Sequence, residues 1–296
     1  MKSLTVKQFF TQYPSDEACL QHIFDVRFGA DHTCSKCGTV GKWYRIKAER
    51  AFSCGSCGNH LHPTVGTIFE GSRTSLQSWF YAIYLFTTTR HGVPAKELER
   101  QLGVTYKTAW RMGHKIREHM AAVDGDEPLS GDVEVDETLI GGVLPRSENP
   151  DYRANKSIVL GMLERDGDVH TQVIPNTSKY TLQNAIKDTV EQGSTIHTDE
   201  HPGYKGIDND LFGEDYDYAH TTVNHSAGEY VDGNAHVNGI ENFWSQLKKG
   251  ISGTHVHASE KWMENYAKEF EYRYNSRNEP EAMFSELTET FPELRD

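Results

Sequence analysis

The sequence lacks any apolar run that approaches the roughly 18 residues of a membrane-spanning helix, and its mean hydropathy is −0.65. Its N-terminal segment also lacks the continuous apolar stretch and small-residue cleavage site of a secretory signal. These absences argue against a membrane partner and predict a cytoplasmic protein. With 296 residues, 36% of them hydrophobic, the chain is long enough for one sizeable core and small accessory modules.

Positive charge is also scarce, with 30 Lys and Arg residues against 43 Asp and Glu residues and a net charge of −13. This balance alone argues against nucleic-acid binding, because phosphate binding needs Lys and Arg. Binding depends on local patches, however, and cationic residues cluster in segment 107–117 and at Lys248 and Lys249. Those of the first segment are Lys107, Arg111, Lys115 and Arg117. DNA is therefore not excluded as a partner, and we hypothesise that the acidic excess keeps the protein soluble in a salty cytoplasm.

Cysteine is rare as well, but four of the five cysteines form two CxxC pairs. The pairs are Cys34 with Cys37 and Cys54 with Cys57, separated by 16 residues. Four thiolates at this spacing predict a tetrahedral zinc, and the glycine after each pair suits a tight knuckle turn. Because four protein ligands leave no open position, the zinc is predicted to be structural, in a ribbon with short strands at 42–46 and 51–53. The alternative is two unrelated pairs of buried cysteines, and Cys19 is interpreted as an ordinary buried thiol.

Segments 93–102 and 106–119 have the outline of a helix-turn-helix. Gly103 supplies the turn, and Thr105 can cap the second helix. A recognition helix carries its contacts on a polar face, so the DNA-binding candidates are Lys107, Thr108, Arg111 and Lys115. The alternative is a helical hairpin with a solvated basic face. Two further helices are predicted upstream, at 15–28 and 75–88.

Beyond an acidic linker at 123–128, the pattern changes to short apolar runs typical of strands, with one intervening helix. The predicted strands are 133–138, 157–165, 169–174 and 195–198, and the helix is 179–192. Strands with an intervening helix predict a mixed α/β sheet, so the change of pattern marks a second domain.

Two carboxylates stand on or directly after these predicted strands. Alternation along the first strand places Asp136 on the same face as Asp132 and Glu134. Asp199 directly follows the strand at 195–198. Both aspartates are therefore candidate metal ligands at strand ends.

A third candidate ligand lies on a predicted amphipathic helix in segment 236–251. Its apolar stripe consists of Ile240, Phe243, Trp244, Leu247 and Ile251. Glu241, Ser245 and Lys248 share a neighbouring polar face. Magnesium prefers oxygen ligands, and two such ions can activate a water or a 3′-hydroxyl and stabilise the leaving oxygen in phosphoryl transfer. Three carboxylates suit that chemistry.

The combination of motifs resembles the DDE superfamily of insertion-sequence transposases, in the group with an N-terminal zinc ribbon before a ribonuclease H-like catalytic domain. Besides the four cysteines, the resemblance is carried by GTIFEG at 66–71, LGVTYKTAWR at 102–111, VDET at 135–138, HTDEHPGY at 197–204 and HVNGIENFWSQLK at 236–248. These motifs extend over nearly the whole chain.

The resemblance implies that Asp136 and Asp199 are the paired aspartates, Glu241 is the third ligand and Lys248 lies beside the DNA end. The implied cofactors are structural zinc and two catalytic magnesium or manganese ions. Some relatives use Asn as the third residue, so Asn238 is the alternative to Glu241, which we favour because an anionic ligand binds a hard cation better.

The predicted fold class is therefore α/β, with a ribonuclease H-like mixed sheet core. The predicted parts are an N-terminal helix and zinc ribbon at 1–66, a helical region with the helix-turn-helix at 67–123, the catalytic core at 130–251 and a C-terminal helical extension at 252–296. The predicted function is binding of double-stranded DNA at element ends, followed by cleavage and strand transfer to target DNA. We expect a homodimer or higher oligomer in the DNA complex and a nucleoid-associated location. The alternatives are a DNA-binding regulator without catalysis and a structure-selective nuclease on the same core.

Overall fold

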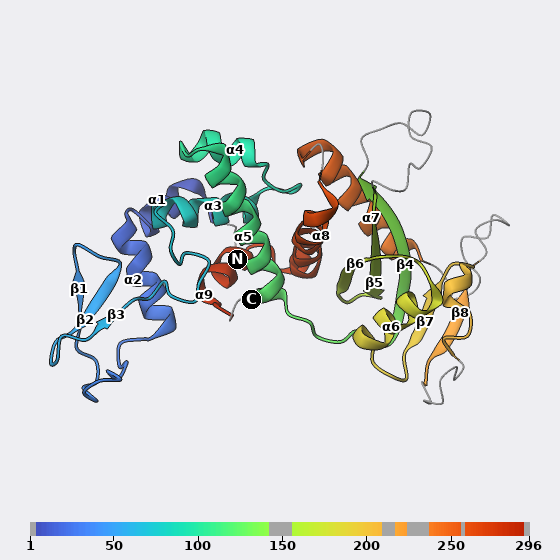
Figure 1. Cartoon of the computed structure of the whole chain (residues 1–296), viewed down its shortest axis with the longest axis horizontal. Helices are drawn as coiled ribbons and strands as arrows, with labels where there is room; N and C mark the ends of the chain where they lie inside the picture. The colour runs from blue at the N-terminus through green and yellow to red at the C-terminus, as the bar shows by residue number, and fades with distance from the viewer. Residues whose placement is uncertain (1–3, 142–155, 209–216, 224–236, 256–257, 293–296) are drawn as a thin grey trace. The chain divides into compact units, whose positions relative to one another are not determined.

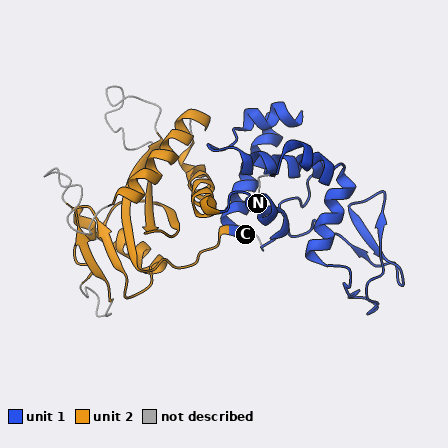
Figure 2. Cartoon of the chain, turned by 180° about the vertical axis from the view of Figure 1, so that it is seen from behind, with its two compact units in different colours: residues 1–123, 279–296 blue, residues 124–278 orange. Residues whose placement is uncertain are grey.

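A computed structural model of the chain shows two compact units (Figures 1 and 2). Unit 1 comprises residues 1–123 and 279–296, and unit 2 comprises residues 124–278. The structure describes residues 4–141, 156–208, 217–223, 237–255 and 258–292. Within these ranges, every helix is too short or too polar to cross a membrane.

Unit 1 is built from helices around an aromatic core. Its helices are α1 (Val6–Gln12), α2 (Asp16–Arg27), α3 (Leu76–Thr88), α4 (Ala95–Leu102), α5 (Tyr106–Asp124) and α9 (Met283–Glu289). The last of these comes from the far end of the sequence and packs against α2 and α3. Its carbonyl groups lie against two histidines, His22 Nε2 at 3.1 Å from the Thr288 oxygen and His119 Nε2 at 2.9 Å from the Leu287 oxygen. The C-terminal segment is therefore an integral part of unit 1.

The small sheet of unit 1 is an antiparallel ribbon of order β1-β2-β3. Its strands are β1 (Trp43–Ile46), β2 (Ala51–Cys54) and β3 (His60–Leu61). The two strands expected between the CxxC pairs are confirmed, and β3 adds a third that follows the second pair.

Unit 2 is centred on a five-stranded mixed sheet of order β6-β5-β4-β7-β8. The strands are β4 (Asp132–Gly141), β5 (Lys156–Glu164), β6 (Val169–Ile174), β7 (Thr195–Thr198) and β8 (Ala219–Thr222). The first three are antiparallel, whereas β4, β7 and β8 are parallel. All four predicted strands are present, and β8 is an additional edge strand.

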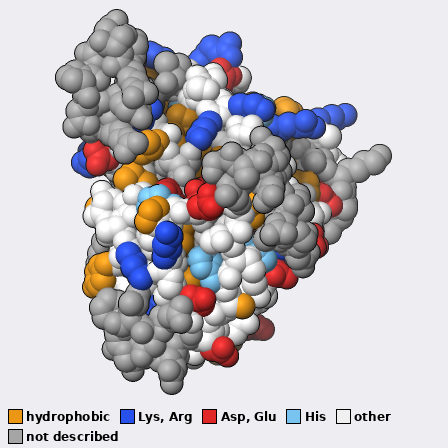
Figure 3. All heavy atoms as spheres, turned by 90° about the vertical axis from the view of Figure 1, so that its right-hand side faces the viewer, with side chains coloured by type: hydrophobic (Ala, Val, Ile, Leu, Met, Phe, Trp, Pro, Cys, Tyr) orange, Lys and Arg blue, Asp and Glu red, His pale blue; other side chains and the backbone are white. Residues whose placement is uncertain are grey.

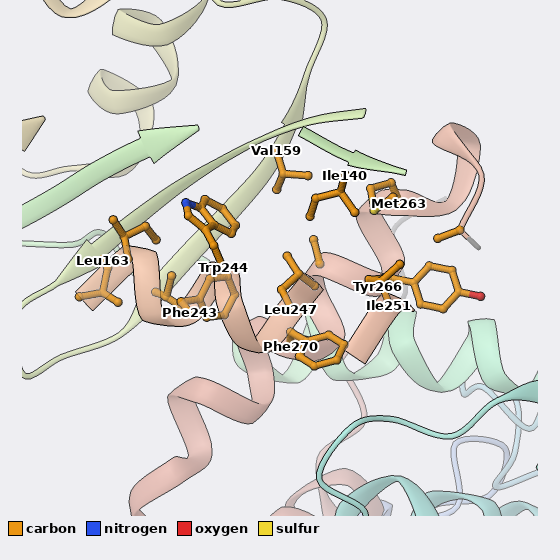
Figure 4. Packing of buried hydrophobic residues seen from close by; sticks show 14 of the residues in the cluster. Ile140, Val159, Leu163, Phe243, Trp244, Leu247, Ile251, Met263, Tyr266 and Phe270 are labelled. Atoms are coloured by element: carbon orange, nitrogen blue, oxygen red, sulfur yellow. The ribbon is translucent and has the colours of Figure 1, made fainter. Parts of the chain in front are cut away.

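Helices cover both faces of this sheet. On one face α6 (Lys179–Thr189) packs on a core that includes Val133 and Val135 of β4. On the other face α7 (Asn238–Gly250) and α8 (Glu260–Asn275) pack on Val159 and Ile140, as Figure 4 shows. Short helical turns complete the unit at Pro202–Tyr204, Ile251–His255 and Ser276–Asn278. Alternation along β4 therefore sends Asp132, Glu134 and Asp136 toward the α7 face.

The outer edge of β6 is closed by side chains of α8. The backbone N–H of Val169 donates to Asn275 Oδ1 at 2.8 Å, and that of Thr171 donates to Glu271 Oε2 at 2.7 Å. The N–H of Val173 donates to Glu264 Oε2 at 2.8 Å. Unpaired edge amides invite pairing with another chain, so these helix side chains protect the sheet.

The predicted fold class is confirmed as a mixed α/β fold with a cysteine cluster near the N-terminus and C-terminal helices. The region at 252–296, predicted as one helical extension, contributes α8 to unit 2 and α9 to unit 1. The roles assigned to the four predicted parts of the chain remain predictions.

Candidate functional site

The four paired cysteines come together in the ribbon. All four sulfur atoms lie within 4.8 Å of one another. The Cys34 and Cys57 sulfurs are 3.7 Å apart, and the Cys37 and Cys54 sulfurs are 3.6 Å apart. Zn–S bonds of about 2.3 Å imply sulfur–sulfur edges of about 3.8 Å in a tetrahedron. The cluster therefore has the size that a tetrahedral zinc requires.

The turns after the two pairs are equivalent. Gly38 and Gly58 both have φ +71°, a conformation that favours glycine. Their N–H groups donate to the carbonyl oxygens of Cys34 and Cys54, each at 2.9 Å. Each turn thus folds one CxxC pair into a knuckle, as the glycine positions predicted.

Asp136 faces α7 from the middle of β4, not from the strand end that the sequence predicted, because β4 continues to Gly141. The indole N–H of Trp244 donates to its Oδ2 at 2.9 Å. Burial raises the pKa of Asp136 to about 7, with further increases from the carboxylates of Glu137 and Asp199. The carboxyl group is therefore oriented by α7 and repelled by two neighbouring acids.

Asp199 stands directly after β7, in a turn that is tied to β4. Its Oδ1 accepts the N–H of His201 at 2.9 Å. The Tyr204 hydroxyl donates to Glu137 Oε2, and His201 Nε2 lies 3.9 Å from Glu137 Oε1. Burial raises the pKa of Tyr204 well above its usual range, so this hydroxyl stays protonated as a donor. Glu137, which had no predicted role, thus anchors the Asp199 turn.

Glu241 is exposed in the first turn of α7, and Asn238 is the exposed first residue of the same helix. Among the described residues, two groups have three or more ligand atoms within 4.8 Å of one another, the cysteine cluster and the exposed set of Glu49, His60 and His62. The carboxylates of Asp136, Asp199 and Glu241 are not such a group. Two cations roughly 3.5–4 Å apart could be held by carboxylates that lie farther than 4.8 Å from one another.

The donor set fits divalent cations on chemical grounds. Hard cations prefer carboxylate oxygen. The carboxylates of Glu137 and Asp199 both raise the pKa of Asp136, and a bound cation would relieve their mutual repulsion. Asp136 and Asp199 are thus brought into one electrostatic site, and Glu241 lies on the helix that contacts Asp136.

A groove of about 600 Å³ runs along the ends of β4, β5 and β6. Charged residues from separate elements line it together with His201, namely Glu137, Lys156, Lys248 and Glu260. The polar face of α7 thus brings Lys248 to the same edge of the sheet as the Asp199 turn. In the space-filling view of Figure 3, Lys and Arg side chains lie among Asp, Glu and His side chains, so positive charge on this face is confined to small groups of side chains.

The expected two-helix segment is present in unit 1 as α4, a turn and α5. Gly103 ends α4 in the left-handed conformation with φ +64°. The Thr105 hydroxyl accepts the N–H of Thr108 at 3.3 Å, which caps α5 as predicted. Lys107 and Arg111 are exposed, whereas Thr108 and Lys115 are half-buried.

Arg117 does not belong to this basic surface. Only 3% of the residue is exposed, and its guanidinium lies 5.1 Å from the centre of the Phe86 ring. It also donates to the Val93 carbonyl oxygen at 3.4 Å. The interpretation of segment 107–117 as one cationic cluster is therefore wrong for this residue, because its planar cation stacks on an aromatic face inside the unit.

A mixed sheet with acidic residues on its central strand β4 and directly after β7, preceded by a cysteine ribbon, is the architecture that the sequence resemblance implied. Residues 128–275 match the ISXO2-like transposase domain, and residues 14–60 match the transposase zinc-ribbon domain. The chain therefore belongs to the ISXO2-like transposase family, which confirms the resemblance. The family implies an enzyme that cleaves and transfers DNA.

The chain is also similar to a protein in transposable element ISH50 of Halobacterium salinarum. The two are 25% identical over 280 residues, which cover 88% of this chain and 91% of the relative. The similarity thus extends through both compact units.

Proposed function

We propose that this protein binds the terminal inverted repeats of an insertion sequence and catalyses DNA cleavage and strand transfer with two magnesium or manganese ions. The observation that carries the proposal is the proximity of Asp136, in the middle of β4, to Asp199, directly after the parallel neighbour β7, which lets the Asp199 carboxylate raise the pKa of Asp136. Both residues lie within the part of the chain that matches a transposase domain.

In this proposal, Asp136, Asp199 and Glu241 hold the divalent cations. Such cations, when bound, activate a water or a 3′-hydroxyl and stabilise the leaving oxygen. Trp244 orients Asp136 through its indole N–H. Lys248, exposed on the groove side of α7, contributes attraction to the phosphates of the DNA end.

Amide substitutions of the three acids separate chemistry from binding. Asp136→Asn, Asp199→Asn and Glu241→Gln keep the size of each side chain but remove the charge that binds a cation. Each variant should fold and bind an end-containing duplex, yet neither cleave nor join it with magnesium or manganese. Activity in both aspartate variants would refute the mechanism. Full activity in Glu241→Gln beside an inactive Asn238→Ala would show that Asn238 is the third ligand.

Lys248→Ala should behave differently from the acidic variants. An ammonium attracts phosphate but does not ligate a cation, so end binding should weaken while manganese binding is unchanged. End binding equal to that of the wild type would remove Lys248 from the DNA interface. In the same assays, cleavage without joining would favour a structure-selective nuclease, and binding without cleavage by the wild type would favour a regulator.

We further propose that the turn and α5 bind DNA as a helix-turn-helix, through Lys107, Thr108, Arg111 and Lys115. Each lost phosphate contact should reduce the slope of log affinity against log salt by about one unit. Alanine variants of the three cationic residues should show this reduction. Lys7→Ala, a change of an exposed lysine on α1, is the matched control and should leave the slope unchanged. Unchanged slopes in all variants would place the interface elsewhere.

A further inference from the structure

We propose that Glu134 is a positioning residue that fastens the N-terminus of α7, which carries Glu241, to β4, which carries Asp136. The inference rests on the proposed function, because it assigns Glu134 a role in placing two proposed cation ligands relative to each other. Glu134 itself does not touch the reacting groups in this proposal.

The contacts of Glu134 are those of a helix cap supplied from the sheet. Its Oε2 accepts the N–H of Gly239 at 2.8 Å and that of Ile240 at 3.1 Å. The residue before α7, Val237, provides no side-chain cap. Helix N-termini leave backbone N–H groups without partners inside the helix, and here a carboxylate far away in the sequence accepts two of them.

Positively polarised groups surround both carboxylate oxygens of Glu134. Arg165 Nε donates to its Oε1 at 3.1 Å, and the positive end of the α7 dipole faces its other oxygen. Only 1% of Glu134 is exposed. Since a buried ion pair can often be replaced by apolar residues without loss of stability, stability alone gives little reason for a carboxylate at this position.

A second contact holds α7 further along its length. Trp244, which lies after the first turn of α7, donates to Asp136, two residues after Glu134 on the same face of β4. The approach at the first contact is close, because a Cβ on Gly239 would lie 2.9 Å from Glu134 Oε2. Strand β4 therefore fixes both the position of α7 and its rotation about its own axis. Glu241 directly follows Ile240, whose N–H is the second that Glu134 accepts.

The test compares Glu134→Gln with Glu271→Gln in the full-length, zinc-loaded protein. Glu271 is a matched control because it is also a buried carboxylate that accepts a backbone N–H and pairs with a cation, Lys268, but it holds β6 instead of α7. Glu134→Gln should weaken manganese binding, measured by electron paramagnetic resonance, by about tenfold or more, a typical effect of changing a residue that orients a ligand. It should also speed deuterium exchange in peptides that contain 239–241. Glu271→Gln should change neither.

A second variant tests the same contact without burying an unpaired charge. Gly239→Ala keeps Glu134 and Arg165 but pushes the first fastened amide away, so it should weaken manganese binding in the same direction. If Glu134→Gln does not fold, manganese binding by Gly239→Ala tests the positioning role of Glu134. Manganese binding and exchange equal to the wild type in a folded variant would overturn the positioning role. Absence of cleavage by the wild type would instead count against the proposed function, while the exchange measurement would still decide whether Glu134 holds α7.

Discussion

Gly161 is a residue at which the packing of α7 against the sheet can be perturbed directly. It lies on β5 opposite Asp136 of β4. A Cβ at this position would lie 2.6 Å from two ring carbons of Trp244 and 2.8 Å from Ile240 Cδ1. Gly161→Ala should therefore push α7 away from the sheet at the point where its indole orients Asp136.

The expected loss of stability is the difference between two opposing effects. Replacing glycine by alanine stabilises by about 0.4–1 kcal/mol where the backbone permits it, because the unfolded chain loses entropy. Overpacking destabilises by about 1–3 kcal/mol. The ring of Trp244 cannot easily move, since only 3% of the residue is exposed and its N–H is bonded. We expect a net loss of about 1–2 kcal/mol, or roughly 2–8 °C in the unfolding temperature.

Thermal unfolding of the full chain followed by circular dichroism measures this loss. Trp244→Phe removes the ring atoms that the new Cβ would meet, so Gly161→Ala should destabilise less in that background. Gly253→Ala, where nothing lies within 4 Å of an added Cβ, is the matched control and should have little effect. A stabilised Gly161→Ala, or an equal loss with and without the tryptophan, would refute the packing argument.

Two further predictions concern the ribbon and Asp124, the last residue of α5, whose carboxylate accepts the side-chain N–H of Asn275 at 3.0 Å. Cys34→Ser should abolish stoichiometric zinc and unfold the ribbon while unit 2 stays folded, because structural zinc contributes folding energy directly. The control Cys19→Ser, at a buried thiol outside the cluster, should keep its zinc. Identical zinc content of both variants by atomic absorption would contradict the assignment. Burial, and to a smaller extent the Glu271 carboxylate, raises the pKa of Asp124 to about 7. The Asp124 carboxyl group therefore binds its proton more tightly in the folded state than in the unfolded chain. The free energy of unfolding should therefore fall as pH rises from about 4 to 7, by at most about 4 kcal/mol. Asp124→Asn should make the unfolding temperature depend less on pH in this window. An unchanged dependence on pH in this variant would contradict the shift.

Much of the unit 2 sheet could be predicted because its strands are buried and apolar. The runs that became β5 and β6 stand out from their polar surroundings, and the alternation in β4 assigned its faces correctly. Strand β8, with sequence AHTT at Ala219–Thr222, carries no apolar pattern and is paired only because β7 lies beside it. Such an edge strand depends on its neighbour rather than on its own residues.

The site shows the same division between local and distant causes. Cysteine spacing and strand patterns are local signals, and they indicated the cysteine cluster, the face of Asp136 and the position of Asp199 after β7. The prediction that Asp136 ends its strand was wrong, because β4 continues to Gly141. The role of Glu134 depends on amides more than 100 residues away, so alternation could assign its face but not its partner. Arg117 shows the reverse error, since charge alone suggested a surface position and a contact with Phe86 determines a buried one.

The net charge of −13 must be reconciled with the proposed DNA binding, and ion pairs inside the protein do not account for it. Buried acids such as Glu134 and Glu271 pair with Arg165 and Lys268. Each such pair removes one cation from the surface along with one anion, so the surplus of negative charge stays outside. In the proposed function, attraction to DNA comes from local groups such as Lys107, at a range limited to about 8–10 Å at ordinary ionic strength. Repulsion between the remaining acidic surface and DNA is screened by the same salt, so an acidic chain of this kind should lose affinity with salt less steeply than its phosphate contacts alone would dictate.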